Sequence, residues 1–364
     1  MLYLLPDELL VAILEHCDQK TRKSLSLVSR RLRNPSQHII FKTMNITRNI
    51  FGNIVPGFVF EGSGEHCPEV IQNDRFLSYI QTFNIPRGNS LHYLRMDAIE
   101  LLFTALHRMQ RLRDIKLSDI LFTTTMLDRL CEVLSARPYT VELRYCVYPA
   151  DYIFQQATLK IHRLWLEYRS IGGVLQLAES KLLVAIIERS LSSIASLTLS
   201  SGLGLLAYLG TMPRLTSLNI QSKSARNDET LRNFLVANPQ IVELTLDGVH
   251  WDLSLLPPSA LPNLRTIRVA AVMIQHLLQG RPVVKVEINM SLRFNFVVDG
   301  LHALSRSATP IVELTLHFPS QFTPLCEILY TVVEAVPRLE RIWLSFHSEV
   351  RSVLHFWPSL TTPF

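Results

Sequence analysis

The sequence is poor in charged residues, in cysteine and in long hydrophobic runs, and each shortage excludes a class of protein. Charged residues make up 18% of the 364 positions and hydrophobic residues 48%, which is far from the composition of a disordered chain. The five cysteines are an odd number without a close pair, so we expect reduced thiols rather than a disulfide framework. Because no run of about 18 consecutive apolar residues occurs, we expect no membrane-spanning segment.

The basic excess is also small. The formal net charge of +5 comes from lysines and arginines scattered along the whole chain, which is typical of a solvated surface, so we expect no nucleic-acid partner. The apolar start lacks a basic stretch and a small-residue cleavage site, and Pro6 interrupts it, so we interpret it as folded protein rather than a signal peptide. Reduced thiols and no signal peptide together predict a cytoplasmic or nuclear location.

Residue patterns that would hold a cofactor or a metal ion are missing as well. The segment Gly62-Ser-Gly-Glu65 lacks the lysine and the Ser/Thr of a phosphate loop, and His66-Cys67 has no second pair at zinc spacing. His317 and Glu313 would share one face of a sheet, but no nucleophile or metal set accompanies them. We therefore expect no cofactor and no enzyme activity.

What the sequence does contain is a repeated outline with apolar residues at positions one, four and six. Ile241-Val-Glu-Leu-Thr-Leu-Asp247 returns as Ile311-Val-Glu-Leu-Thr-Leu-His317, and a proline stands one or two residues before each copy. The copies start at Ile80, Leu112, Thr140, Ile161, Ile194, Leu215, Ile241, Leu264, Val283, Ile311 and Leu339. Most of the spacings between them are those of stacked repeats, which predicts a solenoid rather than a globular sandwich.

Helical patterns lie between several of these copies. They cover Leu91 to Met109, Leu175 to Ile187, and a helix after Asn227-Asp228 that carries Leu231, Phe234 and Leu235. Strands that return in one direction require a parallel sheet with the helices outside, so the fold class is α/β. The outline resembles that of leucine-rich repeats. The asparagine usual in such repeats is missing, so we expect an irregular horseshoe with uneven helices.

Before the repeats, the first forty-five residues predict three short helices. The first covers Asp7 to Cys17, the second Thr21 to Arg33, and a third begins at Asn34-Pro35. So small a unit buries too little surface to be stable alone. Its apolar residues exceed a single stripe, so we expect it to pack on the repeats and on another protein.

These helices resemble an F-box. The resemblance rests on Leu5-Pro6-x-Glu8-Leu9-Leu10-x-x-Ile13-Leu14, on Leu25-Ser-Leu-Val28-Ser29-Arg30-Arg31 and on Ile40-Phe41-Lys42. Cys17 and Arg22 depart from the usual leucines, and Leu32 replaces a frequent tryptophan. The resemblance implies docking on a Skp-type adaptor, which joins a cullin and a RING subunit in a ubiquitin ligase. The residues that it places against the adaptor are Leu5, Pro6, Leu9, Leu10, Ile13, Leu14, Leu25, Leu27 and Val28.

The resemblance implies a substrate-recognition subunit that is monomeric apart from this complex. The alternative is a leucine-rich-repeat scaffold or inhibitor without a ligase role, in which the helices are only a cap. We expect four parts: an F-box module over residues 1–45, a connector and cap over 46–75, repeats over 76–346 and a C-terminal cap over 347–364. The last is expected to be helical, because Val350, Val353, Leu354 and Trp357 fall at helical spacing.

A protein target would bind the concave sheet face, to which positions three, five and seven point because strand residues alternate faces. Tryptophan flanked by arginine is typical of interface anchors. The predicted contacts are Lys116, Arg144, Arg163, Trp165, Arg268, Arg341 and Trp343. In the alternative interpretation, Trp343 packs under the C-terminal cap and Trp165 under a neighbouring loop.

Overall fold

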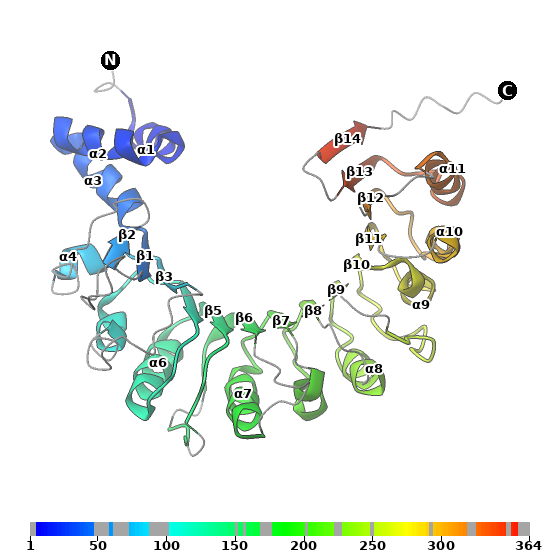
Figure 1. Cartoon of the computed structure of the whole chain (residues 1–364), viewed down its shortest axis with the longest axis horizontal. Helices are drawn as coiled ribbons and strands as arrows, with labels where there is room; N and C mark the ends of the chain where they lie inside the picture. Colours follow the sequence, from blue (N-terminus) through cyan, green and yellow to red (C-terminus); the bar gives the residue numbers. More distant parts are fainter. Residues whose placement is uncertain are drawn as a thin grey trace. The chain divides into compact units, whose positions relative to one another are not determined.

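The computed structural model consists of two compact units, Met1–Tyr168 with Gln176–Ser193 and Arg169–Leu175 with Ile194–Phe364 (Figure 1). It describes residues 5–46, 58–60, 73–86, 102–149, 152–155, 158–167, 177–200, 203–221, 228–247, 251–290, 294–318, 325–346 and 351–355. Asn227, Val350 and Trp357, residues 62–67 and the first part of the helix expected from Leu91 lie outside this description. In the described part of the chain, no helix is both long and apolar enough to cross a bilayer.

The first unit begins with three helices, α1 (Asp7–His16), α2 (Gln19–Val28) and α3 (Arg30–Ile40). The prediction of a second helix through Arg33 and a third from Asn34 was wrong. Ser29 is extended, with φ −149° and ψ 138°, and its side chain accepts a hydrogen bond from the Arg31 N–H, so α3 begins at Arg30. Pro35 lies inside α3, where it removes one backbone donor without ending the helix.

The sheet of the first unit has the order β2-β1-β3-β4-β5-β6. The strands are β1 (Thr43–Ile46), β2 (Phe58–Phe60), β3 (Thr82–Ile85), β4 (Asp114–Ser118), β5 (Tyr139–Arg144) and β6 (Ile161–Glu167). All neighbours pair in parallel except β1 and β2. The connector predicted over residues 46–75 therefore supplies an edge strand, β2. The returning segments include α4 (Asp74–Leu77), η4 (Leu106–Arg108), α6 (Thr124–Ala136) and α7 (Leu177–Ser190).

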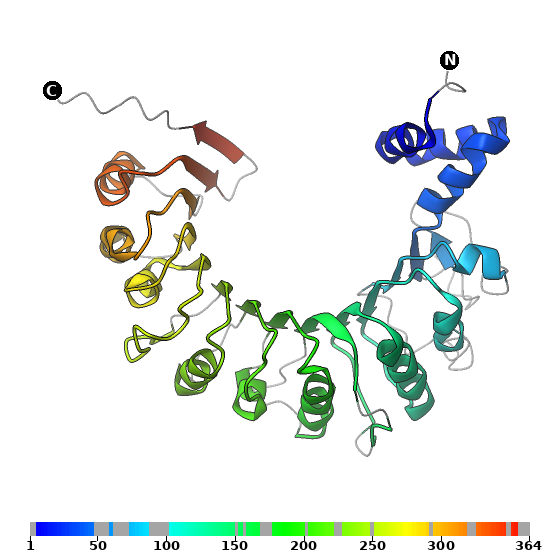
Figure 2. The same cartoon turned by 180° about the vertical axis from the view of Figure 1, so that it is seen from behind.

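The second unit has the order β7 to β14, parallel from β7 to β13. Its strands are β7 (Ser196–Ser200), β8 (Ser217–Gln221), β9 (Glu243–Asp247), β10 (Thr266–Ala270), β11 (Lys285–Asn289), β12 (Glu313–Phe318), β13 (Arg341–Phe346) and β14 (Arg351–His355). Its helices are η5 (Leu203–Tyr208), α8 (Asp228–Ala237), η6 (Ala271–Met273), α9 (Ile274–Leu278), α10 (Phe294–His302), η7 (Ala303–Arg306) and α11 (Leu325–Ala335). Within this unit α8, α9, α10 and α11 lie on one side of the strands (Figures 1 and 2).

The repeat outline predicts the core of both units. Positions four and six are buried in every copy whose frame was right, for example Phe83 and Ile85 at 0% and 1% exposed. The copy at Thr140 was placed two residues late. Ile115 of β4 pairs with Val141, so Val141 and Leu143 fill positions four and six. A shift of two residues preserves the alternation of faces, so Arg144 was still placed on the correct face.

The predicted helical end of the chain was wrong. Residues Arg351–His355 form β14, which pairs antiparallel with β13. Pairing gives the outer backbone groups of β13 hydrogen-bond partners that a helix would not have supplied. The other helical patterns were better guides: α7 covers most of the segment expected from Leu175, and Leu231, Phe234 and Leu235 of α8 are buried.

Candidate functional site

The first two helices leave large apolar side chains in solvent. Leu9 and Ile13 of α1 are 51% and 42% exposed, and Leu27 and Val28 of α2 are 78% and 71% exposed. We call these four residues the α1–α2 apolar surface. A folded chain usually removes such side chains from water, because each gains about 1.5–3 kcal/mol on full burial. The exposure of four large apolar side chains on these two helices marks them as residues that a partner could cover.

The remaining residues predicted to face the adaptor divide into two groups. Pro6 is exposed, and Leu5 and Leu25 are half-buried, so all three remain accessible in part. Leu10 and Leu14 are each 1% exposed. Both fill the interior of the helical module, and we therefore remove them from the predicted contact surface. Helical periodicity alone did not separate the two faces of α1, because apolar residues cover more than one stripe of it.

Arg22 and Arg31 fix the helices that carry this surface. The Arg22 guanidinium donates from Nε to the Leu14 carbonyl oxygen at 2.7 Å and from Nη2 to the Glu15 carbonyl oxygen at 3.0 Å. Arg31 forms an ion pair with Asp7 at 2.9 Å, which joins α3 to the start of α1. These polar contacts hold the helices of the module together, so the α1–α2 apolar surface is not needed to join them.

The third helix attaches the module to the first repeats. The His38 ring lies 4.2 Å from the Tyr79 ring, and the Phe41 ring lies 4.7 Å from the Phe76 ring. Arg111 Nη1 lies 3.1 Å from His38 Nδ1. Burial, followed by the positive charges of Arg111 and Arg75, lowers the pKa of His38. The third helix and Phe41 thus pack on the segments before β3 and β4, while Leu9, Ile13, Leu27 and Val28 stay exposed.

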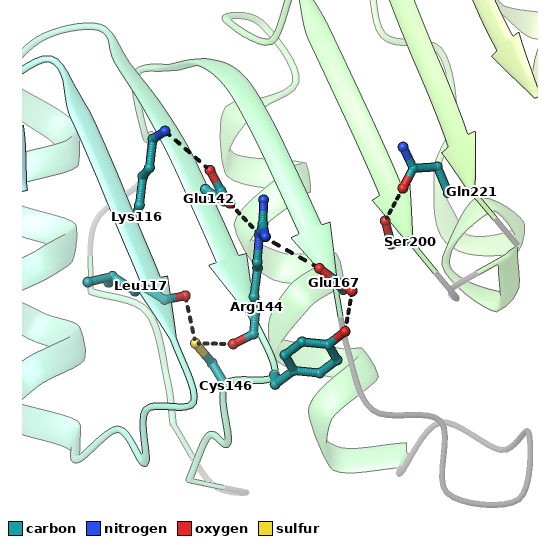
Figure 3. Close-up of polar contacts among 9 residues, drawn as sticks. Lys116, Leu117, Glu142, Arg144, Cys146, Glu167, Ser200 and Gln221 are labelled. Atoms are coloured by element: carbon teal, nitrogen blue, oxygen red, sulfur yellow. Dashed lines mark hydrogen bonds and ion pairs between the residues drawn. The ribbon is translucent and has the colours of Figure 1, made fainter. Parts of the chain in front are cut away.

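On the strand face of the first unit, two of the three predicted cations, Lys116 and Arg144, are paired with carboxylates (Figure 3). Lys116 lies 3.8 Å from Glu142, and Arg144 pairs with both Glu142 and Glu167, the latter at 3.7 Å. The Arg144 guanidinium also lies 4.1 Å from the ring centroid of Trp165. The structure therefore brings Lys116, Arg144 and Trp165 together, in an arrangement whose charges largely cancel.

Trp165 and Arg163 differ in their surroundings although both lie on β6. Trp165 is half-buried beneath Arg144, and its indole Nε1 is buried without a hydrogen-bond partner among the described residues. Arg163 is exposed and pairs in register with Thr140. Arg163 is therefore the more accessible of the two predicted contacts.

On the strand face of the second unit, cations are likewise paired with carboxylates. Arg268 lies 3.7 Å from Asp247 and 3.9 Å from Glu287. Lys285 lies 3.5 Å from Glu287 and 3.7 Å from Glu313, and Arg341 pairs with Glu313. The predicted contacts Arg268 and Arg341 thus belong to one alternating row. Trp343 is 38% exposed although its strand pairs with β14, so this ring is accessible to a partner.

The residues considered for catalysis are arranged as structural groups. His317 Nε2 lies 3.9 Å from Glu287, while Glu313 is paired with Lys285 and Arg341. Burial raises the pKa of the Cys131 and Cys146 thiols to about 12, so neither supplies a thiolate near neutral pH. Among the described residues, no group of three or more His, Cys, Asp and Glu side chains could hold a metal ion.

The sequence analysis did not identify a set of arginines at the amino ends of the strands in the first unit. Arg111, Arg113 and Arg137 line one groove of the first unit. Arg111 stands directly before position one of its repeat, and Arg137 does so once the frame of β5 is corrected. Basic residues at this place in successive repeats were the available signal.

Comparison with known proteins agrees with the observed architecture at the amino terminus. Residues 2–34 match the F-box domain family, and F-box domains generally bind Skp-type adaptors. Among solved structures, the chain is similar to the leucine-rich repeat-containing protein LegL7 from Legionella pneumophila, with 14% identity and a TM-score of 0.46 over 85% of this chain and 92% of that one. No curated protein sequence matches. The chain therefore carries an F-box domain at its amino terminus, followed by parallel repeats of the leucine-rich type.

Proposed function

We propose that this chain is the substrate-recognition subunit of a Skp/cullin/F-box ubiquitin ligase. In this role the F-box binds a Skp-type adaptor and the repeats recruit a protein target. Other subunits of the ligase carry out ubiquitin transfer, and this chain contributes proximity by joining two binding events. Such an assembly acts in the cytoplasm or the nucleus.

The observation that carries the proposal is the exposure of Leu27 and Val28 on α2 together with that of Leu9 and Ile13 on α1. A hydrophobic cluster gains binding energy when a partner removes it from water, at about 25 cal/mol for each Å² of apolar area. A carboxylate introduced into the centre of such an interface would be buried without a partner, which costs several kcal/mol. Substitution of one exposed leucine by aspartate is therefore a strong test that leaves the core of the module intact.

The experiment is coexpression of the full chain with a Skp-type adaptor, followed by size-exclusion chromatography. The native chain should co-elute with the adaptor, and Leu27→Asp and Leu9→Asp should each reduce complex formation by at least about tenfold. Leu255→Asp is the matched control, because Leu255 is 72% exposed but lies in the second unit. Absence of a complex with the native chain at micromolar concentration, or equal binding by all variants, would contradict the proposal.

A second candidate is a repeat scaffold in which the F-box is only a cap. It is favoured by the packing of α3 and β1 against the first repeats, where Met44 is fully buried and β1 pairs with β3. Deletion of the first 45 residues would remove most of β1 and expose β3, so such a truncation would damage the repeats under either hypothesis. Intact target binding together with no adaptor binding by the native chain would favour the scaffold, because a module that is only a cap makes no adaptor contact.

A further inference from the structure

A groove of about 590 Å³ lies at the amino ends of the strands in the first unit. Its lining includes Gln81 before β3, Arg111 and Arg113 before β4, Arg137 before β5, and His162 of β6. We call this feature the strand-edge groove. These residues come from successive repeats, so the groove runs across the strands rather than along one of them.

The strand-edge groove differs from both strand faces in its balance of charge. Three arginines line it, and no carboxylate is among its lining residues. On the strand faces, by contrast, Lys116, Arg144, Arg268, Lys285 and Arg341 have carboxylate partners, and Arg163 is the exception among the cations named above. The positive charge of the groove is thus not compensated by its own walls, and a concave basic site of this kind attracts anions.

The known contacts of these arginines are to neutral groups. Arg137 donates from Nε to the Tyr139 hydroxyl at 2.8 Å and from Nη2 to the Met109 carbonyl oxygen at 2.5 Å. Arg111 contacts the His38 ring, and the side chain of Arg113 is exposed without an ion pair among the described residues. Arg137 is therefore held in place by the fold, while its charge and those of Arg111 and Arg113 remain available.

The basic surface continues toward the F-box. A second groove of about 600 Å³ shares Gln81 and Arg111 with the first and adds Arg30 and Lys42. Asp7 and Glu15 also line it, but Asp7 is already paired with Arg31. The two grooves therefore adjoin at Gln81 and Arg111, and cations line both of them, so a long anionic ligand could extend from one into the other.

We propose that the strand-edge groove binds an acidic, carboxylate-rich segment of a partner protein in extended conformation. The spacing supports this occupant: adjacent strands lie about 4.8 Å apart, and side chains on one face of an extended peptide repeat at roughly 6.8 Å, so successive carboxylates could reach arginines from neighbouring repeats. The identity of the partner as a ubiquitination target rests on the receptor role proposed above, whereas its binding to the groove does not.

Two observations favour a carboxylate-rich peptide over other anions. A nucleic acid bound as a single strand gains much of its affinity by stacking successive bases on exposed aromatic rings, but Tyr139 of the groove is only 3% exposed, which leaves the single ring of His162. The arginines precede two successive strands, β4 and β5, so their charge is spread along the groove, as separate carboxylates are along a peptide.

The test is fluorescence anisotropy with the full chain, alone and with its adaptor. The probe is a labelled peptide of alternating aspartate and serine, and the matched peptide carries asparagine instead of aspartate. The aspartate peptide should bind with an affinity that falls as salt is raised, and Arg111→Gln combined with Arg113→Gln should weaken it by about tenfold. Arg113→Glu should weaken it further. Arg214→Gln is the control, because Arg214 is exposed directly before position one of a repeat in the second unit.

Equal binding of the aspartate and asparagine peptides, or no effect of the Arg111 and Arg113 changes, would overturn the proposal. Tighter binding of single-stranded RNA, or of a neutral peptide with one phosphoserine, would also overturn it in favour of that ligand. The double variant should still co-elute with the adaptor, and Leu27→Asp should still bind the aspartate peptide. These two results separate failure of the groove from failure of the receptor role.

Discussion

The guanidinium of Arg22 in α2 donates a hydrogen bond to the carbonyl oxygen of Leu14 near the end of α1, with 2.7 Å between Nε and the oxygen. The last carbonyl groups of a helix lack partners within that helix, and Arg22 satisfies two of them, since its Nη2 also contacts the Glu15 carbonyl oxygen. F-box sequences usually have a leucine at this position. The departure thus exchanges an apolar contact for a polar cap that orients α1 relative to α2.

Replacement of Arg22 by leucine should therefore loosen α1 although it restores the usual residue type. Loss of two hydrogen bonds to carbonyl oxygens should lower the free energy of local unfolding by about 1–2 kcal/mol. Hydrogen exchange of the α1 amides measures this change, with Lys20→Leu, an exposed position of the same helix α2, as the control. Unchanged or slower exchange in Arg22→Leu would show that the cap does not stabilise α1.

Arg281 is a second arginine whose role is structural. It is fully buried, and its guanidinium donates at 2.7 Å to the carbonyl oxygens of Ala260, His276 and Pro257. Burial lowers its pKa to about 10. Arg281→Met leaves these three carbonyl groups without their donor, so the second unit should lose about 3 kcal/mol or more of stability.

Chemical denaturation of Arg281→Met, followed by tryptophan fluorescence, to which the buried Trp251 of the second unit contributes, measures this loss. Arg281→Lys should recover little of the lost stability, because an ammonium group does not reproduce the planar set of N–H donors of a guanidinium. Arg265→Met is the control, since Arg265 is exposed and its hydrogen bond to the Pro282 carbonyl oxygen is long, at 3.5 Å. A similar small effect of the Arg281 and Arg265 changes would contradict the structural role.

The ionisation of Glu287 makes the stability of the second unit depend on pH. The His317 imidazole, 3.9 Å from the carboxylate, lowers the pKa of Glu287 below its usual 4.5, and the charges of Lys285 and Arg268 lower it further. A lowered pKa means that the fold favours the carboxylate. The resulting stabilisation is present above about pH 4.5 and is lost as the pH falls through the lowered pKa.

Glu287→Gln should therefore lower the unfolding temperature near neutral pH and flatten its decline below about pH 4.5. Unfolding temperatures measured across this range, with Glu340→Gln as the control, test the linkage, because Glu340 is exposed in the same unit. An acid profile of Glu287→Gln parallel to that of the native chain would remove Glu287 as a cause.

The prediction of the F-box surface shows where local pattern stops being informative. Leu9 and Leu10 are adjacent leucines with the same propensities, yet Leu9 is 51% exposed and Leu10 is 1% exposed. Helical spacing described an apolar arc on α1 without saying which part of it α3 covers. The position of α3 was itself mispredicted, because Ser29 rather than Asn34 caps it.

The sequence pattern also could not predict which charged residues on the strand face form ion pairs. Arg144 was placed on the correct face despite an incorrect frame, because a shift of two residues preserves alternation in a strand. Its pairing with Glu142 and Glu167 depends on the register of β5 with β6, which is set by contacts between repeats. For this reason Arg144 was predicted to be an available cation although its charge is compensated.

The sequence by itself determined the parallel repeats, their buried positions and the presence of a helical module at the amino terminus, because these follow from the periodicity of side chains along one segment. Only the tertiary structure decided which leucines of that module stay exposed, which cations have carboxylate partners, and that Arg111, Arg113 and Arg137 line one groove. Each of these depends on distances between residues from different repeats or helices, and such distances are fixed by packing rather than by local spacing.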